Sequence, residues 1–167
     1  AFNPVFFDAE EWVKLAKDCG MKYFVVTSKH HDGFAMFHSK VDKYNVVDAT
    51  PFGRDVIGEI AEACYKHGLK MGLYYSQDLD WHHPDYPHYG DRIHPMRNHP
   101  ECSNENRDFS RYIEYMYNQV EEVCTNYGKI DIMWFDFSYD DMRGEKWGAT
   151  RLIDMVRRLQ PGIIIDN

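Results

Sequence analysis

One unit recurs four times along this sequence of 167 residues: an amphipathic helix, then a glycine, then a short apolar strand. In the first unit, Asp8 and Glu11 have the spacing of a capping box, and apolar residues then follow at helical spacing. That apolar face consists of Trp12, Leu15, Ala16 and Cys19. The four predicted strands cover residues 23–27, 71–75, 130–135 and 163–165. Because strands that alternate with helices form parallel sheets with right-handed crossovers, the recurrence predicts an α/β fold.

The other three helices are read from the same helical spacing. The second is predicted from Asp55 to the stop at Gly68, the third over residues 104–127, and the fourth ahead of Pro161. Their predicted apolar faces are Ile57, Ile60, Ala61 and Cys64, then Ile113, Tyr117, Val120 and Cys124, and then Leu152, Met155, Val156 and Leu159. Cys19, Cys64 and Cys124 are accordingly interpreted as small buried helix residues.

A parallel sheet of this kind closes either as an open doubly wound sheet or as an eight-stranded barrel. No glycine-rich phosphate loop follows any strand, which weakens the nucleotide-binding version. Four consecutive units are half of a barrel. The sequence enters a helix almost at once and stops directly after a strand. We therefore expect residues 1–167 to be part of a (β/α)8 TIM-like barrel, a fragment of one catalytic domain that is truncated at both ends.

Composition excludes several classes of partner. The chain is 44% hydrophobic and 28% charged, which is typical of a globular protein. Its formal net charge of −8 argues against nucleic acid and against an anionic membrane surface. No run approaches the roughly 18 apolar residues that a membrane-spanning helix needs. We expect neither nucleic acid nor membrane as a partner.

Polar and aromatic residues gather where the predicted strands end, which is where a barrel builds its active site. Asp136 closes the third strand, between Phe135 and Phe137. Side chains alternate along a strand, so Trp134 and Asp136 point the same way. A carboxylate beside an aromatic ring suits a sugar and an oxocarbenium-like transition state. A helix-capping or loop aspartate is the alternative interpretation.

Histidines are frequent, but their spacing fits no metal-ligand pattern. His30 and His31 are adjacent, so in an extended segment their rings would point to opposite sides. Residues 77–103 form the longest irregular stretch, and it contains His82, His83, His88, His94 and His99 with Asp78, Asp80 and Asp85. No HExxH or similar spacing occurs there. We expect no metal and no cofactor; a metal-dependent barrel hydrolase or isomerase remains the alternative.

Three motifs resemble the α-L-fucosidases of glycoside hydrolase family 29. They are Lys-His-His-Asp-Gly-Phe at 29–34, Gly-Leu-Tyr-Tyr-Ser at 72–76 and Trp-Phe-Asp at 134–136. Segments 44–48 and 54–55 and the Ile-Ile-Asp-Asn ending are also similar to that family. The resemblance implies a retaining exo-hydrolase on a (β/α)8 barrel. It implies removal of terminal α-L-fucose from oligosaccharides or glycoconjugates through a covalent fucosyl-enzyme. It also suggests export to the periplasm, the cell exterior or the lysosome.

The resemblance assigns roles to particular residues. Asp136 matches the nucleophile, and His30 and His31 match a substrate-binding pair. Tyr75 and Trp134 match sugar-contacting aromatics, with Tyr74 as the alternative if the tyrosine is misplaced by one position.

The general acid/base is expected beyond Asn167. Glu145 and Asp141 carry no matching motif and are not assigned that role. A sugar-binding pseudoenzyme that has lost this acid is the alternative outside the enzymes.

Overall fold

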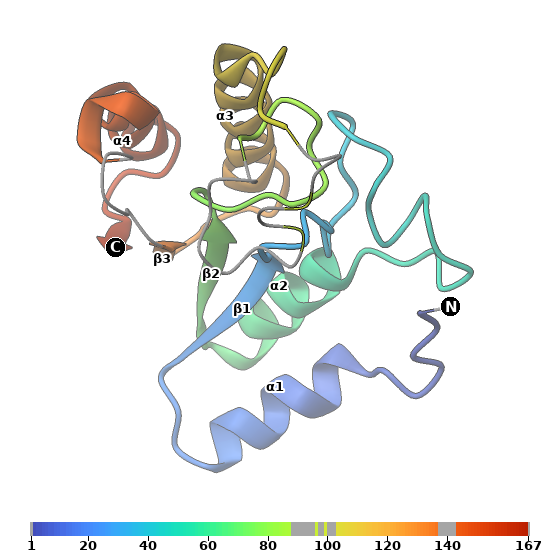
Figure 1. Ribbon diagram of the computed structural model, residues 1–167. Helices are drawn as coiled ribbons and strands as arrows, with labels where there is room; N and C mark the ends of the chain where they lie inside the picture. Colours follow the sequence, from blue (N-terminus) through green and yellow to red (C-terminus); the bar gives the residue numbers. More distant parts are fainter. Residues whose placement is uncertain (1, 88–95, 97–98, 100–102, 137–142, 167) are drawn as a thin grey trace.

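The computed structural model describes residues 2–87, 96, 99, 103–136 and 143–166 (Figure 1). Its elements, in chain order, are α1 (Ala9–Asp18), β1 (Tyr23–Lys29), α2 (Val56–His67), β2 (Lys70–Ser76), α3 (Phe109–Asn126), β3 (Ile132–Asp136), the 3-10 helix η2 (Gly144–Trp147), α4 (Ala149–Leu159) and β4 (Ile164–Asp166). The strands pair in parallel in the order β1-β2-β3-β4. The predicted alternation of helix and strand is confirmed.

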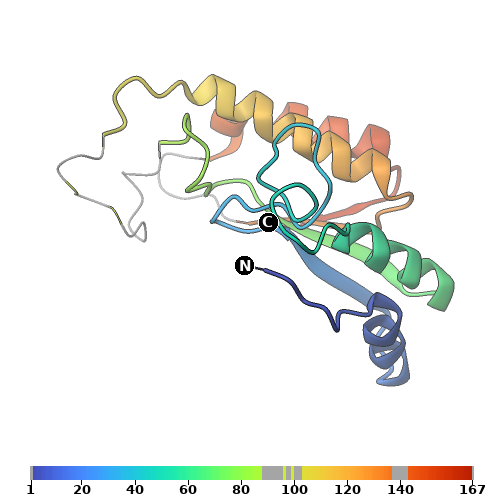
Figure 2. The ribbon, with the colours of Figure 1, turned by 90° about the vertical axis from the view of Figure 1, so that its right-hand side faces the viewer.

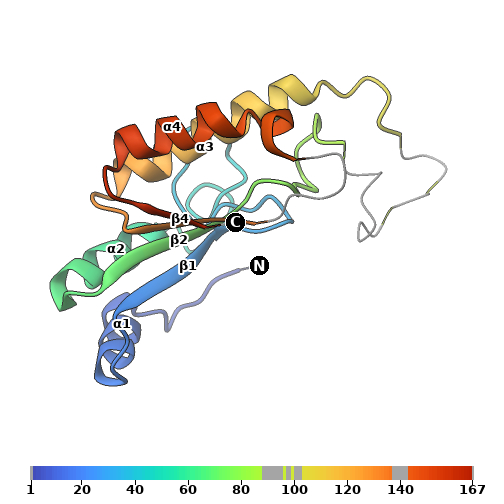
Figure 3. The same cartoon turned by 90° about the vertical axis from the view of Figure 1, so that its left-hand side faces the viewer.

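The sheet has one covered and one uncovered face. The helices form an arc along the covered face (Figures 1 and 3). That face contributes fully buried strand residues to the core: Met71, Leu73, Tyr75 and Met133. The opposite face, which we call the inner face, carries Tyr23, Trp134 and Ile164, whose exposed fractions are 56%, 43% and 62%. Large apolar side chains exposed on one face of a sheet indicate a face that normally contacts other protein.

Local signals set most of the helix ends. Asp8 caps α1 by accepting a 3.0 Å hydrogen bond from the Glu11 amide, as its spacing predicted. Asp55 caps α2, and Gly68 ends it in the left-handed conformation, with φ of 71°. The third helix begins later than predicted, at Phe109, because Asp108 provides its cap.

The predicted apolar face of α1 is confirmed at Ala16 and is wrong at its other positions. The buried residues are Ala9, Val13 and Ala16, whereas Trp12 and Leu15 are 51% and 64% exposed. Small residues let α1 lie close against α2, which explains why the alanines face inward. Cys19 follows the helix and is exposed, contrary to the prediction, while Cys64 and Cys124 are buried as predicted.

Gln160 joins the ends of three elements on the covered side. Its side-chain amide donates 2.7 Å hydrogen bonds to the carbonyl oxygens of Cys124 and Gly128. Its carbonyl oxygen accepts a 3.0 Å bond from the Ile130 amide, just before β3. These bonds tie α3 to α4, which lie side by side (Figure 2). In the part of the chain that the structure describes, no helix combines the length and apolar character that crossing a membrane requires.

Candidate active site

The strand register brings the candidate residues to the inner face. Tyr74 of β2 pairs with Trp134 of β3, and Ser76 pairs with Asp136. On the other side of β3, Trp134 pairs with Asp166 of β4. Paired residues of parallel strands point to the same face, and so do residues two apart on one strand. Tyr74, Ser76, Trp134, Asp136 and Asp166 therefore share this face at the carboxyl end of the sheet.

Asp136 is held by a tyrosine. The Tyr74 hydroxyl donates a short hydrogen bond to Asp136 Oδ2. Burial raises the pKa of Tyr74, and the hydrogen bond to Asp136 and its negative charge raise it further. The phenol therefore stays protonated and remains a donor. The Tyr74 ring meets the Trp134 ring edge-on, with 5.6 Å between centroids. The Asp136 side chain is 15% exposed, so it is enclosed but reachable.

His31 lies beside this carboxylate, and His30 contacts both His31 and Tyr74. His31 Nδ1 is 2.8 Å from Ser76 Oγ, and His31 Nε2 is 3.9 Å from Asp136 Oδ2. The His30 ring stacks on the Tyr74 ring at 5.6 Å, and the two histidine rings are 4.0 Å apart. The expectation that they point to opposite sides is wrong. β1 has a register irregularity after Thr27 and ends at Lys29, so the histidines are not in an extended segment.

The structure separates the two candidate tyrosines. Tyr75 is fully buried on the covered face, and its hydroxyl donates a 2.8 Å hydrogen bond to Gln119 Oε1 of α3. Burial places its pKa well above the ordinary value. A side chain in this position does not reach a sugar bound at Asp136. The prediction of Tyr75 as a sugar-contacting residue does not fit this geometry, whereas the alternative, Tyr74, does.

Sequence reasoning missed a buried ion pair next to the site. Lys29 Nζ lies 2.7 Å from Asp80 Oδ2, and the two side chains are 0% and 1% exposed. The ammonium also lies 4.7 Å, 5.1 Å and 5.7 Å from three tyrosine ring centroids, those of Tyr75, Tyr115 and Tyr112. Asp80 Oδ1 accepts hydrogen bonds from the amides of residues 82 and 83. The pair thus fastens the loop after β2 to the end of β1.

Gly33 marks where the loops after β1 and β2 touch. Its φ is 77°, and a Cβ atom there would lie 2.4 Å from Asp80 Oδ1. Only glycine fits so close an approach in this conformation. Nearby, the Trp81 amide donates a 2.8 Å hydrogen bond to the His31 carbonyl oxygen. The glycine of the Lys-His-His-Asp-Gly-Phe motif was the sequence signal for this contact.

The remaining candidates are placed as follows. Glu145 accepts a 3.2 Å hydrogen bond from the Thr150 amide and a short one from the Thr150 hydroxyl, so it caps the start of α4. Asp141, His88 and His94 lie outside the described residues. Within the described ranges, no group of three or more His, Cys, Asp or Glu side chains is arranged to hold a metal ion.

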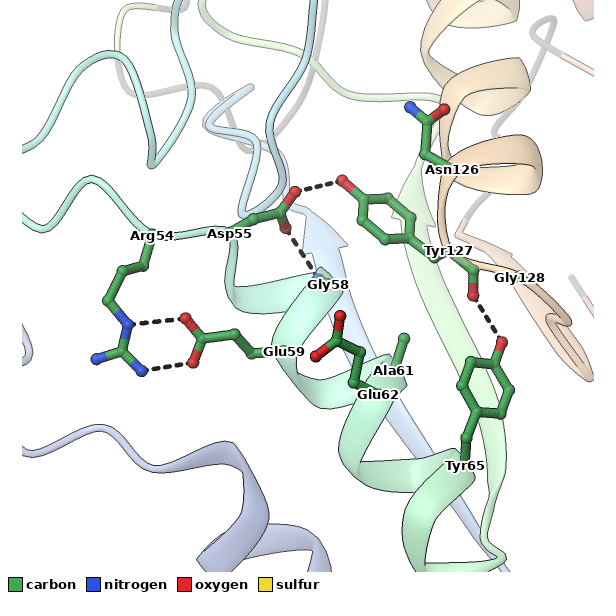
Figure 4. A pocket seen from close by; sticks show the side chains of 10 residues that line it. All are labelled: Arg54, Asp55, Gly58, Glu59, Ala61, Glu62, Tyr65, Asn126, Tyr127 and Gly128. Carbon is green, nitrogen blue, oxygen red and sulfur yellow. Dashed lines mark hydrogen bonds and ion pairs between the residues drawn. The ribbon is translucent and has the colours of Figure 1, made fainter.

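A groove of about 600 Å³ lies elsewhere, on the outer side between α2 and α3 (Figure 4). Hydrogen bonds from two tyrosine hydroxyls cross the groove between the two helices. The Tyr127 hydroxyl donates a 2.6 Å hydrogen bond to Asp55, and the Tyr65 hydroxyl shares its proton between the carbonyl oxygens of Tyr127 and Lys129, each 2.6 Å away. These bonds join the two helices, and none of the predicted site residues lines the groove.

Comparison with known proteins identifies the family of the chain. The family model described as alpha-L-fucosidase matches residues 1–167. Alpha-L-fucosidase 1 of Arabidopsis thaliana is 30% identical over 98% of this chain and 29% of its own length. The structure of alpha-L-fucosidase isoenzyme 1 from Paenibacillus thiaminolyticus has a TM-score of 0.96 and 57% identity, covering all of this chain and 39% of that one.

The unliganded alpha-L-fucosidase AlfC from Lactobacillus casei has a TM-score of 0.87 and 48% identity, covering 98% of this chain and 52% of that one. This chain therefore spans between 29% and 52% of the length of these relatives. The predicted fold class, an α/β chain that forms part of a TIM barrel, is confirmed by the parallel strand order and by the match to these structures. The chain belongs to the alpha-L-fucosidase family.

Proposed function

We propose that the protein is a retaining α-L-fucosidase that removes terminal α-L-fucose from oligosaccharides or glycoconjugates. The observation that carries the proposal is the Asp136 carboxylate, held by Tyr74 at the carboxyl end of β3 in a chain of this family. AlfC has been solved with its α-L-fucose product, and a variant of AlfC has been solved with Fuca(1,6)GlcNAc. These complexes support fucosylated glycans as the substrate class.

In the proposed reaction, an Asp136 oxygen attacks the anomeric carbon while the glycosidic bond breaks and the leaving oxygen takes a proton from a second carboxyl group. This gives a covalent fucosyl ester and the free alcohol. Water then attacks the same carbon, loses a proton to the second carboxylate, and releases fucose and Asp136. Two displacements return the original anomeric configuration, as in other retaining glycosidases.

The neighbours of Asp136 would bind the sugar. Trp134 offers an apolar ring beside the carboxylate, and His30 and His31 offer imidazole nitrogens to hydroxyl groups. The Tyr74 hydroxyl holds Oδ2 and stabilises the negative charge before the attack.

Asp166 is the second carboxyl group that we propose, in place of a residue beyond Asn167. It pairs with Trp134 across the sheet and shares the inner face with Asp136. Strand spacing places the two aspartate Cα atoms roughly 8 Å apart. Side chains that lean toward each other would bring the two carboxyl groups to the ~5–5.5 Å that separates them in retaining enzymes.

We further propose that residues 1–167 are part of one catalytic barrel domain, whose other units cover the inner face. The exposed Tyr23 and Ile164 support this, and so do the longer relatives.

The test of the nucleophile is Asp136→Ala in the full-length protein. Turnover of an aryl α-L-fucoside should fall by several orders of magnitude while fucose still binds. Azide should partly restore activity and give fucosyl azide of the opposite anomeric configuration. Asp131→Ala is the control, because Asp131 lies just before β3 at the other end and is similarly enclosed, with 13% of its side chain exposed. Near-normal turnover in Asp136→Ala refutes the assignment. Binding of fucose without hydrolysis by the unaltered protein would indicate a pseudoenzyme.

The test of the proton donor is Asp166→Asn. With a poor leaving group, kcat/KM should fall about 10²–10⁴-fold, which is the usual contribution of general acid catalysis. An activated aryl leaving group needs little protonation, so that substrate should lose much less in the same variant. The exposed Asp154, changed to Asn, is the control. Equal losses on both substrates would exclude Asp166 as the acid.

A further inference from the structure

Ser76 connects the loop after β2 to the ring of His31. Ser76 is fully buried, and its Oγ lies 2.9 Å from the Leu79 carbonyl oxygen and 2.8 Å from His31 Nδ1. A carbonyl oxygen only accepts hydrogen bonds, and a serine hydroxyl has one proton to give. Both contacts are satisfied together only when Ser76 donates to Leu79 and His31 Nδ1 donates to Ser76. The arrangement therefore selects the form of His31 that carries a proton on Nδ1.

The other nitrogen of the ring points at the reaction centre. In a neutral imidazole with its proton on Nδ1, Nε2 is an acceptor. This Nε2 lies 3.9 Å from Asp136 Oδ2, the oxygen to which Tyr74 donates. The distance is too long for a direct hydrogen bond. The structure thus offers an acceptor nitrogen and a carboxylate at the same end of the sheet.

We propose that Ser76 is a positioning residue that fixes this tautomer, so that His31 Nε2 accepts a hydrogen bond from a hydroxyl group of the bound sugar. The inference rests on the proposed function for its ligand. The opposite tautomer would aim an N–H at the Asp136 carboxylate, compete with the sugar and weaken the nucleophile. Among the described residues, the titratable groups beside His31 include Asp136 from β3 and the neighbouring His30, whose ring stacks in turn on Tyr74 of β2.

The first test reads the tautomer directly. Nitrogen-15 NMR of the full-length protein with labelled histidines distinguishes a protonated Nδ1 from a protonated Nε2, and His31→Gln assigns the signal. The wild-type signal should show the proton on Nδ1. Ser76→Ala should shift it toward the Nε2-protonated form, and Ser76→Thr should restore the wild-type pattern.

Ser28→Ala is the matched control. Ser28 is also fully buried, and its hydroxyl donates a 2.7 Å hydrogen bond to the Tyr74 carbonyl oxygen without touching a histidine. It should lose similar stability and leave the His31 signal unchanged. A wild-type proton on Nε2 overturns the proposal, even if Ser76→Ala fails to fold.

The second test asks whether a sugar hydroxyl is the donor. Ser76→Ala should lower kcat/KM for an aryl α-L-fucoside about 10–100-fold, the range expected for a lost hydrogen bond in a charged site. The 2-, 3- and 4-deoxy fucosides are then compared. For the sugar that lacks the hydroxyl donating to Nε2, wild type and variant should differ little.

An equal loss on all three deoxy sugars would mean that Ser76 is merely structural, and that result refutes the proposal. If the wild-type protein hydrolyses no fucoside, the proposed function fails. The NMR measurement would then still show whether Ser76 determines which ring nitrogen of His31 carries the proton.

Discussion

Lys29 and Asp80 form an ion pair closed off from water, with 2.7 Å between Nζ and Oδ2. A buried pair of this kind contributes little net stability, but removing one partner leaves the other as an uncompensated buried charge. The pair also fixes the geometry of the site, because Lys29 directly precedes the two histidines and Asp80 holds the loop that contains Trp81.

Lys29→Met should therefore destabilise the protein strongly, by about 3–5 kcal/mol. The double variant Lys29→Met with Asp80→Asn should recover part of that loss, since no charge is then left buried. Urea denaturation of the full-length protein measures both. Lys14→Met is the control, because the Lys14–Asp18 pair is solvent-exposed and should leave the midpoint unchanged. Additive losses in the double variant would show that the two charges are not coupled.

Tyr74→Phe and Tyr75→Phe should affect different properties. Tyr74→Phe removes the donor to Asp136 and should lower kcat/KM roughly 10–100-fold with little effect on stability. Tyr75→Phe leaves the buried Gln119 Oε1 unpaired and should cost about 1–3 kcal/mol of stability while kcat/KM stays near normal. Kinetics and denaturation of both variants provide the test. The reverse pattern would return the sugar contact to Tyr75.

Thiol chemistry should follow burial and pH. Burial raises the pKa of Cys64 to about 11 and that of Cys124 to about 12, from an ordinary 9.0. At pH 8, iodoacetamide should modify the exposed Cys19 in the native protein and spare both buried thiols. Peptide mapping reads each site separately, and denatured protein, in which all should react, is the control.

The same pKa shifts predict alkaline destabilisation. In the unfolded chain these thiols ionise near pH 9, whereas in the folded protein they stay protonated. Their contribution to stability is complete below pH 9 and is lost as pH rises toward 11 and 12. In the double variant Cys64→Ala with Cys124→Ala, the urea midpoint should fall less steeply between pH 9 and 11. An unchanged slope would show that the two thiols do not cause the alkaline destabilisation.

Chelation should leave activity unchanged. The proposed chemistry uses two carboxyl groups and no metal ion. Among the residues that the structure describes, no cluster of His, Cys, Asp or Glu side chains is arranged to hold a metal. Dialysis against EDTA, followed by aryl fucoside assays and metal analysis, provides the measurement. Activity that disappears with EDTA and returns with zinc or manganese would favour the metal-dependent hydrolase instead.

Residues 1–167 expressed alone should self-associate and show no measurable fucosidase activity. The exposed inner face and the open edges of β1 and β4 both favour association. Gel filtration and an aryl fucoside assay test this. Ile164→Lys, which places a charge on the inner face, should reduce association. A monomeric, active fragment would show that these residues already form a complete site.

Much of this architecture was predictable from periodicity. Helix caps at Asp8 and Asp55 and the alternation of elements follow from local rules that tertiary packing reinforces. The position of Asp136 at a strand end followed in the same way, because a polar residue after an apolar run marks the carboxyl end of a strand.

Other features depend on register between strands, which one sequence does not reveal. Either of two adjacent tyrosines on a strand can point to a given face of the sheet. Only the pairing of Tyr74 with Trp134 shows which one lies on the face of Asp136. The register irregularity in β1, just before the two histidines, is likewise something that no local pattern indicates. No local pattern marks Lys29 as buried, because lysine is rarely buried without a partner and its partner Asp80 is distant in sequence.

The four strands lie in the sheet in the same order as in the chain, which has a consequence for synthesis on the ribosome. Each new strand finds its partner already made, so pairing can proceed while translation continues. The separation in sequence is largest between β2 and β3, because residues 77–131, which include α3, must be made before Trp134 can reach Tyr74. At roughly 5–20 residues per second, β2 waits several seconds with its edge unpaired. During that interval the free edge of β2 exposes backbone groups that can pair with another chain.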